Sequence, residues 1–303
     1  MNESNGPKLR TLIGIDSSAP AHNALQALSE STLAAACEVS LATVVQEPPL
    51  YTVDDTSMPW IPQEVFESRL EIENNQLKQL QQEFGEKFSS CECSVSQGHP
   101  GRGLIEMSER FDADWIVIGS VGHSAFSRIL LGSTSDYVAN RSSRTCLVHR
   151  PATTDGEPSN GLFSRVVIAI SNAESDTALP DWVAALRLVP NCEVHLVHVM
   201  ETHPEYELHL LKKVAAYMEE VRSAAWKLME STRPRLEALG MKVKPNLLES
   251  PHVGRAVLEY ANEHACDLIV VGDQDDSLME RVMLGSVSRF VVRHASQSVL
   301  IVR

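Results

Sequence analysis

The sequence predicts an α/β protein built from two doubly wound domains in tandem, each a five-stranded parallel sheet with helices on both faces. Three observations predict it. Short apolar runs typical of buried strands alternate with longer segments in which apolar residues recur every three or four positions. The same order of segments occurs twice, in residues 11–150 and again in 165–303. A length of 303 residues also suits about two domains, each with its own core. Strands that alternate with helices favour a parallel sheet.

In the first domain the expected strands are short and apolar, and each expected helix has one apolar face that we interpret as a packing surface. In chain order they are a strand at 11–15, a helix carrying Ala24, Leu25, Leu28 and Ala35, a strand at 39–45, a long helix from Phe66 to Phe84, a strand near 93–95, a helix at 104–111, a strand at 115–118, a helix at 134–140 and a strand at 146–148.

The second domain repeats this order with different residues. Its expected elements are a strand at 166–170, a helix carrying Leu179, Val183 and Leu186, a strand at 194–199, a long helix from Leu211 to Leu228, a strand near 243–247, a helix at 256–264, a strand at 268–271, a last helix and a strand at 299–302. Between the two repeats the chain is polar and rich in Pro and Gly, which is typical of a linker. We therefore predict domains at 1–150 and 165–303, joined by a linker at 151–164.

Composition and charge limit the kinds of partner. The formal net charge of −14 argues against nucleic acid or an anionic membrane as the main partner, because both require basic patches. No apolar stretch approaches the roughly 20 residues that cross a bilayer, and the first residues lack the pattern of a signal peptide. We therefore expect a cytoplasmic protein. Cys91 and Cys93 stand two residues apart, but no second pair stands at ligand spacing, so we expect no metal site there.

The most informative motif is Gly119-x2-Gly122-x9-Gly132-Ser133, which directly follows the apolar run 115–118. Glycine at a strand end lets the backbone turn sharply and approach a ligand. The second glycine lets successive N–H groups point inward as an anion-binding nest. The third glycine and the serine stand at the start of a helix, where unpaired N–H groups and the helix dipole favour phosphate. The serine hydroxyl can also contact a phosphate or a bound Mg²⁺. The motif therefore predicts a phosphate-binding loop.

This motif resembles that of the universal stress protein family, whose ATP-binding members carry Gly-x2-Gly-x9-Gly-Ser/Thr at this place. The resemblance covers almost the whole chain as two family domains, and it implies a Rossmann-like fold of the HUP type. It also implies an ATP site, with Mg²⁺ carried by the nucleotide. By this resemblance Asp16 contacts the adenine and the backbone of Val44 touches the base. The residues that match positions lining the ribose and phosphates are Ile118, Gly119, Gly122, Gly132, Ser133 and Thr134.

Other interpretations exist for several of these side chains. Asp16 is also a suitable cap for the helix that follows it, although Ser17 and Ser18 are equally good caps. Arg128 lies between the glycines and could reach a phosphate, but a lone loop arginine is more often solvated. His123 is similar and is expected to be exposed.

The second domain departs from the pattern at two positions. Asp275 replaces the second glycine of the loop, and Ser171 stands where the first domain has Asp16. A carboxylate about 5 Å from a phosphate charge opposes binding by roughly 3 kcal/mol at an effective dielectric constant of about 20, or about a hundredfold in affinity. Asp273 and Asp276 are expected to add to this repulsion. We predict one ATP site per chain, in the first domain. Two alternatives are that Asp275 points to solvent, or that the acidic loop holds a cation or another ligand.

The motif favours a nucleotide-binding protein, and the resemblance implies a nucleotide-dependent regulator in a stress response, with an unknown protein partner. One alternative is slow, Mg²⁺-dependent ATP hydrolysis, although no Walker lysine is present and Asp136 is more plausibly a structural group. Another is an interaction scaffold without nucleotide. By resemblance, the strands at 146–148 and 299–302 are expected to pair as an intramolecular pseudo-dimer, because uncovered edge strands favour pairing. A homodimer of two chains is also possible.

Overall fold

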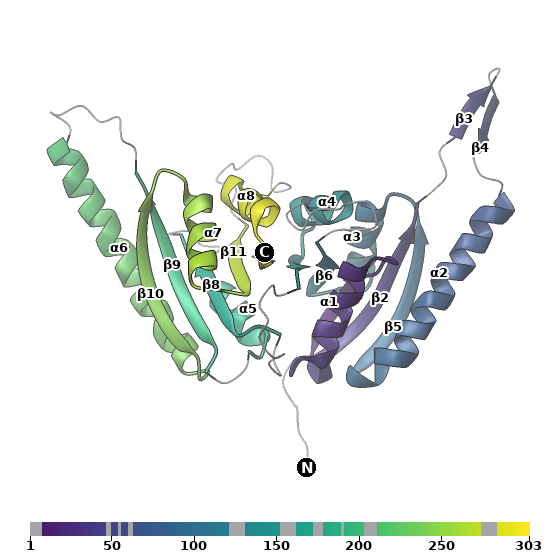
Figure 1. Cartoon of the computed structure of the whole chain (residues 1–303), viewed down its shortest axis with the longest axis horizontal. Coiled ribbons are helices and arrows are strands. Elements are labelled where there is room, and N and C mark those ends of the chain that lie inside the picture. The colour runs from purple at the N-terminus through teal and green to yellow at the C-terminus, as the bar shows by residue number, and fades with distance from the viewer. Residues whose placement is uncertain are drawn as a thin grey trace, which may run out of the picture.

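The computed structural model describes residues 8–46, 50–53, 56–59, 63–120, 131–151, 162–171, 178–188, 191–202, 211–273 and 284–303 (Figure 1). The first half of the chain contributes five strands and four α-helices to the main body of the structure. The strands are β1 (Leu9–Gly14), β2 (Cys37–Val45), β5 (Ser90–Gln97), β6 (Trp115–Gly119) and β7 (Thr145–His149). The helices are α1 (Ala19–Glu30), α2 (Gln63–Phe84), α3 (Pro100–Arg110) and α4 (Ser133–Arg141).

The second half repeats this arrangement. Its strands are β8 (Arg165–Ala169), β9 (Glu193–Glu201), β10 (Lys242–Ser250), β11 (Leu268–Gly272) and β12 (Ser298–Val302). Its helices are α5 (Leu179–Ala185), α6 (Leu211–Glu237), α7 (Val253–Glu263) and α8 (Ser286–His294). The order of strands and helices agrees with the order expected from the sequence.

All ten strands form one sheet, in the order β10-β9-β8-β11-β12-β7-β6-β1-β2-β5. Neighbouring strands within each half are parallel, as the doubly wound fold requires. The halves are joined at the centre by β7 and β12, which pair antiparallel with Leu147 opposite Leu300. The predicted fold class, two tandem α/β domains with parallel five-stranded sheets, is therefore confirmed.

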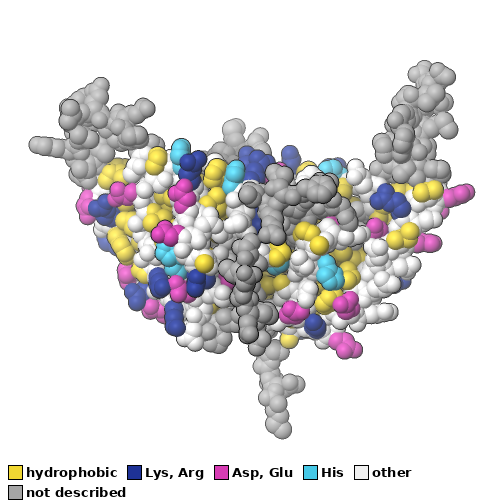
Figure 2. All heavy atoms as spheres, in the orientation of Figure 1, with side chains coloured by type: hydrophobic (Ala, Val, Ile, Leu, Met, Phe, Trp, Pro, Cys, Tyr) yellow, Lys and Arg dark blue, Asp and Glu magenta, His cyan; other side chains and the backbone are white. Residues whose placement is uncertain are grey.

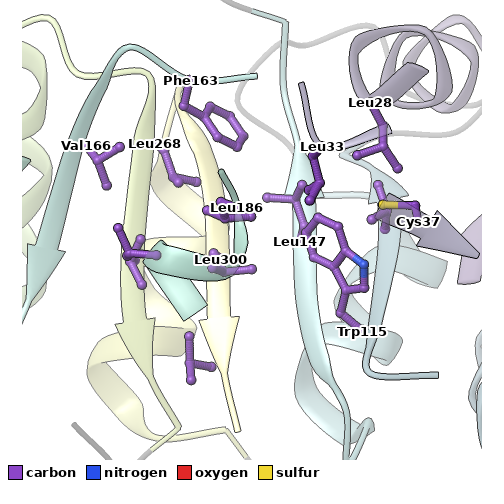
Figure 3. Close-up of a cluster of buried hydrophobic side chains, with 14 of the residues drawn as sticks. Leu28, Leu33, Cys37, Trp115, Leu147, Phe163, Val166, Leu186, Leu268 and Leu300 are labelled. Atoms are coloured by element: carbon purple, nitrogen blue, oxygen red, sulfur yellow. The ribbon is translucent and has the colours of Figure 1, made fainter. Parts of the chain in front are cut away.

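The helices cover the two faces of this sheet because each buries its apolar face against one side. On one face, α1, α2, α5 and α6 enclose a core that includes Leu25, Leu77, Leu179 and Met229. On the other face, α3, α4, α7 and α8 enclose a second core. Figure 3 shows the first of these cores from both halves, with Trp115 and Leu147 on one side of the junction and Leu186 and Leu300 on the other.

Both cores continue through the junction of the two domains. Trp115 is fully buried, its indole N–H donates to Thr11 Oγ1 at 2.7 Å, and its ring lies 6.1 Å from that of Trp182. Val148 and Val299 lie opposite each other in the β7–β12 pair and belong to the second core. The two domains therefore share continuous apolar packing as well as strand hydrogen bonds.

Two details differ from the sequence-based expectation. Strands β3 (Leu50–Val53) and β4 (Thr56–Pro59) pair antiparallel and were not predicted, because four residues are too few to show a period. Ala35 lies in a 3-10 turn, Ala34–Ala36, and not in α1. That helix ends at Glu30, where the Ser31 hydroxyl donates to the carbonyl of Leu28.

No helix in the described part of the chain is long and apolar enough to cross a membrane. Space-filling views show acidic and basic side chains interspersed over the face in Figure 2, with no large patch of a single sign among the residues coloured there.

Candidate functional site

A cavity of about 410 Å³ lies at the carboxyl ends of β1, β2 and β6 in the first domain. This volume falls within the range of small-molecule sites, about 300–1,000 Å³. Its walls include Asp16, Val44, Ile118, Gly119, Gly132, Ser133 and Thr134, which are the residues put forward from the sequence with the exception of Gly122. Gly122 lies outside the described residues, as do His123 and Arg128. Segments distant in the sequence thus meet at one edge of the sheet, where ligands of such folds bind.

Gly119 is fixed by helix packing. It ends β6 against the first turn of α1, and a Cβ atom there would lie 2.6 Å from the carbonyl carbon of Pro20 and 2.7 Å from the nitrogen of Ala21. Both are backbone atoms, so any side chain requires the helix to move. The hydroxyl of Ser135 also donates to the carbonyl of Gly119 at 2.7 Å, which ties this strand end to α4. Glycine here therefore holds α1 and α4 close to the same point.

The N-terminus of α4 faces the cavity without a side-chain cap. Gly132 is the N-cap residue, and it makes no side-chain hydrogen bond to the first turn. The first N–H groups of a helix have no partner within the helix, and they carry the positive end of its dipole. Ser133, Thr134 and Ser135 of this first turn line the cavity. The site therefore offers backbone donors and two exposed or half-exposed hydroxyls to an anion.

Asp16 follows β1 and is exposed at the mouth of the cavity. Its Oδ1 accepts hydrogen bonds from the N–H of Ser18, at 3.1 Å, and from the Ser18 hydroxyl. Ser18 itself caps α1, since its Oγ accepts from the N–H of Ala21 at 3.4 Å. Asp16 is therefore not the cap. It orients the cap residue through one oxygen, while Oδ2 takes no part in that turn.

Several contributors to the site were not identified from the sequence. Gly14 and Gly103 allow close packing beside the cavity. A Cβ on Gly103 of α3 would lie 2.8 Å from both methyl groups of Val44 in β2. A Cβ on Gly14 would lie 2.9 Å from Ile118 Cγ2. The closely spaced glycines after β5 and in the first turn of α3, Gly98, Gly101 and Gly103, were the signal for this close packing. The contacts themselves depend on which residues oppose them across the sheet.

The long helix α2 also lines the cavity, through Arg69 and Glu73. Both lie on a helix whose apolar face indicated only packing. Nothing in its spacing shows that its polar face overhangs the ends of β1 and β2. Arg69 is exposed, so its guanidinium brings a mobile positive charge to the rim of the cavity.

The second domain keeps the framework of this site. The hydroxyl of Ser288 donates to the carbonyl of Gly272 at 2.6 Å, as Ser135 does to Gly119. Gly285 precedes α8 as N-cap, again without a side-chain cap. Ser171 follows β8 at the place of Asp16. Asp275 and Asp276 lie outside the described residues.

Several positions of this second framework hold larger residues than their counterparts in the first domain. Ala169 ends β8 where Gly14 ends β1. In α7, Ala256 stands at the place that Gly103 has in α3. His198 stands at the place of Thr43, and its Nδ1 lies 3.0 Å from the carbonyl of Ile170. Gly14 and Thr43 line the cavity of the first domain, so Ala169 and His198 are larger residues at two positions equivalent to its wall.

Asp273 behaves differently from the expectation that it adds repulsion. Its Oδ2 accepts from Arg303 Nε at 2.7 Å, and its Oδ1 accepts from the N–H of Gly285 at 3.4 Å. The side chains of Asp273 and Arg303 are 20% and 8% exposed. The charge of Asp273 is thus paired within the protein, and its carboxylate occupies the start of α8 where a ligand anion would bind.

Asp136, in the first turn of α4, forms a two-pronged ion pair with Arg293 of α8. Arg293 Nε donates to Oδ1 at 2.7 Å and Nη2 donates to Oδ2 at 2.9 Å. This pair connects the helix whose first turn lines the cavity with the second domain. Asp136 is engaged structurally, which agrees with its interpretation from the sequence.

The described residues contain no group of three His, Cys, Asp or Glu side chains placed to hold a metal ion. Cys91 and Cys93 both lie on the edge strand β5, and burial raises the pKa of each thiol, that of Cys91 to about 12. Thiols that stay protonated at neutral pH are poor metal ligands and poor nucleophiles.

Comparisons with known proteins agree with this architecture. A model of the universal stress protein family matches residues 9–150 and, a second time, 162–303. The chain is 25% identical to universal stress protein MJ0531 of Methanocaldococcus jannaschii over 144 residues, which are 47% of this chain and 83% of that protein. It is 27% identical to universal stress protein YxiE of Bacillus subtilis over 155 residues, 47% of this chain and 100% of that protein. The crystal structure of a universal stress protein from Archaeoglobus fulgidus overlays with a TM-score of 0.65 and 22% identity, covering 97% of this chain and 98% of that one.

Proposed function

Because the chain belongs to the universal stress protein family, we propose that its first domain binds ATP and that occupancy of this site regulates the protein in a stress response. The observation that carries the proposal is the cavity at the carboxyl ends of β1, β2 and β6, onto which the uncapped N-terminus of α4 opens. A polyphosphate needs an electropositive, donor-rich surface of this kind. The net charge of −14 makes such a local surface necessary for any nucleotide to bind.

In this proposal the residues of the cavity have separate tasks. Asp16 and the backbone of Val44 recognise the adenine at the ends of β1 and β2. Ile118 and Gly119 shape the wall beside the ribose, and Gly132, Ser133 and Thr134 receive the phosphates. Gly122 completes the loop, as its place in the motif implies. Mg²⁺ carried with ATP offsets phosphate charge, and Ser133 is the hydroxyl placed to contact it.

The second domain supports the first and does not bind ATP. Ala169 and His198 are larger than their counterparts Gly14 and Thr43, which line the cavity of the first domain, and Asp273 supplies a carboxylate at the start of α8. Asp275 adds a further acidic group to the sequence of this loop. The expected stoichiometry is therefore one ATP per chain.

Regulation fits the arrangement better than hydrolysis. The carboxylate nearest the start of α4, Asp136, is held by Arg293, so it does not serve as a base for water. The same ion pair links the ligand-binding helix to the other domain. A ligand shifts a protein between states only when it binds one of them more tightly. Contacts between α4 and α8 are where such a difference would act. We place this role in the cytoplasm, in keeping with the six cysteines, all of which are free thiols.

The proposal is tested by isothermal titration of ATP into the full chain and two matched variants. Ser133→Asp and Ser286→Asp each place one carboxylate at the exposed first position of α4 or α8. Acidic residues are favourable at helix N-termini, so both variants should fold. We expect Ser133→Asp to weaken ATP binding by about a hundredfold, and Ser286→Asp to leave it unchanged. Two equal sites in the parent protein, or equal effects of both substitutions, would contradict the assignment.

A further inference from the structure

Each domain contributes one arginine that donates hydrogen bonds to the other domain across their junction. Arg150 follows β7 and crosses into the second domain, where Nη2 donates to the carbonyl of Val292 at 2.8 Å and Nη1 to that of Gln297 at 3.1 Å. Its backbone N–H donates to Ser298 Oγ at 2.9 Å. The residue is only 5% exposed, so this guanidinium is buried at the junction.

Arg303 makes the same contacts in reverse. It follows β12, and its Nη2 and Nη1 donate to the carbonyls of Ala139 and Arg144 in the first domain, at 2.6 and 3.2 Å. Its third donor, Nε, is also used, because it binds the Asp273 carboxylate at 2.7 Å. That carboxylate accepts the N–H of Gly285 as well. One acidic group therefore bridges the arginine and the start of α8.

The first domain lacks this acidic group. Ser120 stands at the place of Asp273, since each follows the glycine that ends its strand and donates its N–H to the last residue of the neighbouring strand, at 3.1 and 3.0 Å. Ser120 is 6% exposed, and its carbonyl accepts from Gly132 at 2.8 Å. Arg150 Nε is consequently buried without a hydrogen-bond partner among the described residues. An unpaired buried donor on a charged group is costly.

Among the described residues, the neighbouring His149 does not supply the missing negative charge. His149 precedes Arg150 in the chain and is also buried, and burial and the nearby guanidinium lower the pKa of His149 to about 4, so its ring is neutral. Burial likewise lowers the pKa of Arg150 to about 10, which leaves it charged at neutral pH. The backbone beside Arg150 is linked to the start of α4, because the His149 carbonyl accepts the Ser120 N–H and the Ser120 carbonyl accepts the Gly132 N–H. The described residues thus contain a buried positive group whose counterpart in the other domain, Arg303, is satisfied by a carboxylate at the start of α8.

We propose that Arg150 Nε and the start of α4 form an anion subsite for a phosphate group, and that Asp273 fills the equivalent place in the second domain permanently. The phosphate comes either from the end of the bound nucleotide, in which case the inference rests on the proposed function, or from free inorganic phosphate. Each nitrogen of the Arg150 guanidinium then has a partner. Two of those partners, the carbonyls of Val292 and Gln297, belong to the second domain. The anion therefore strengthens a set of hydrogen bonds that spans the junction.

This subsite connects occupancy with the contact between domains. An anion on Nε fixes the plane of the guanidinium, and that plane sets the hydrogen bonds to Val292 and Gln297. The second domain then responds to a ligand that it does not bind. In the other direction, Asp273 holds the Arg303 guanidinium, so its hydrogen bonds to the first domain do not depend on a ligand.

The test compares Ser120→Asp with the uncharged control Ser120→Asn. Without ligand, we expect Ser120→Asp to unfold at a higher temperature than Ser120→Asn, because it gives Arg150 a carboxylate. Inorganic phosphate, compared with chloride at equal ionic strength, should stabilise the parent protein and Ser120→Asn but not Ser120→Asp, and ATP at equal concentration should stabilise Ser120→Asp less than the other two. We expect Ser120→Asp to weaken ATP binding at least tenfold relative to Ser120→Asn and to leave adenosine binding unchanged. Identical behaviour of the two variants in all these measurements overturns the subsite.

The same experiment shows whether the phosphate is a free ion or part of the nucleotide. It also tests the anion subsite separately from the proposed function. A difference seen with inorganic phosphate identifies a site for the free ion, and one seen with ATP alone identifies the end of the nucleotide. If the parent protein binds neither ATP nor adenosine, the proposed function fails, while the unfolding temperatures and the phosphate response still test the subsite. If Ser120→Asp does not fold, Asp273→Ser is the alternative variant, because it leaves Arg303 Nε unpaired. Asp273→Ser should unfold at a lower temperature than the parent protein and should gain a stabilisation by phosphate at the second domain. No such response would contradict the inference.

Discussion

Replacement of Gly119 by alanine separates two reasons for a glycine at the end of β6. The residue lines the cavity, and it also contacts the backbone of α1. If only ligand binding required glycine, an alanine would weaken nucleotide affinity and leave the unliganded protein intact. If packing requires it, the substitution destabilises the protein with no ligand present.

The structure favours a packing effect of appreciable size. The added Cβ would lie 2.6 and 2.7 Å from backbone atoms of Pro20 and Ala21, whereas ordinary contacts begin at 3.4 Å. The first turn of α1 or the end of β6 must therefore shift by several tenths of an ångström. Overpacking of this kind costs about 1–3 kcal/mol. For a protein of this size we expect a fall in unfolding temperature of roughly 3 °C for a cost of about 2 kcal/mol.

Urea unfolding followed by far-ultraviolet circular dichroism measures the effect without nucleotide. Gly85→Ala is the matched control, because its Cβ would meet its nearest neighbour, Cys91 Cβ, at an ordinary 3.5 Å. This control should be neutral or slightly stabilising, by at most about 1 kcal/mol. Ser18 caps α1 and its N–H donates to Asp16, so a shift of α1 in Gly119→Ala should also weaken nucleotide binding. Equal midpoints for Gly119→Ala, Gly85→Ala and the parent protein would refute the packing argument.

Three further outcomes are expected. The pKa of His149 is about 4 in the folded protein and about 6.5 in the unfolded chain, so below pH 6.5 the unfolded chain binds more protons. The free energy of unfolding should therefore fall by about 3 kcal/mol in total as the pH falls from about 6.5 to 4. Chemical unfolding at several pH values should show a shallower loss for His149→Gln than for the exposed-site control His252→Gln. Arg69→Ala should weaken ATP binding about three- to tenfold, measured by calorimetry, because a charge-assisted hydrogen bond from the guanidinium to ATP at the exposed rim is lost. The unfolding temperature without ligand should not change; a change there would assign Arg69 to packing. A double-mutant cycle on Asp136→Asn and Arg293→Gln should give a coupling of about 0.5–1 kcal/mol in unfolding free energy, since the pair is partly exposed; additive effects would show that the pair is not coupled.

Local sequence patterns were sufficient to predict most of the fold. The apolar runs at 115–118 and 268–271 became the buried strands β6 and β11, because strands covered on both faces must be apolar throughout. The short pair β3 and β4 was missed, since four residues give no periodic signal. The end of α1 was also misplaced, because Ser31 terminates the helix through a bond to its own last turn.

The site was predictable where backbone conformation creates the chemistry. Gly132 and Ser133 indicated a helix start, and the first turn of α4 is found at the cavity without a side-chain cap. Arg69 could not be identified in this way, because its role depends on where α2 passes over the sheet. Gly122 and Asp275 remain predictions, since both lie outside the described residues.

The sequence by itself determined that the chain is a duplicated α/β unit with one intact glycine motif and one altered copy, because period, composition and spacing are local properties. Only the tertiary structure decided how the copies differ in charge. Arg150 and Arg303 occupy matching positions in the sequence, yet one guanidinium nitrogen is unpaired and the other binds Asp273. That difference depends on which side chains the β7–β12 junction brings together across more than a hundred residues, and burial there makes an unpaired charge matter.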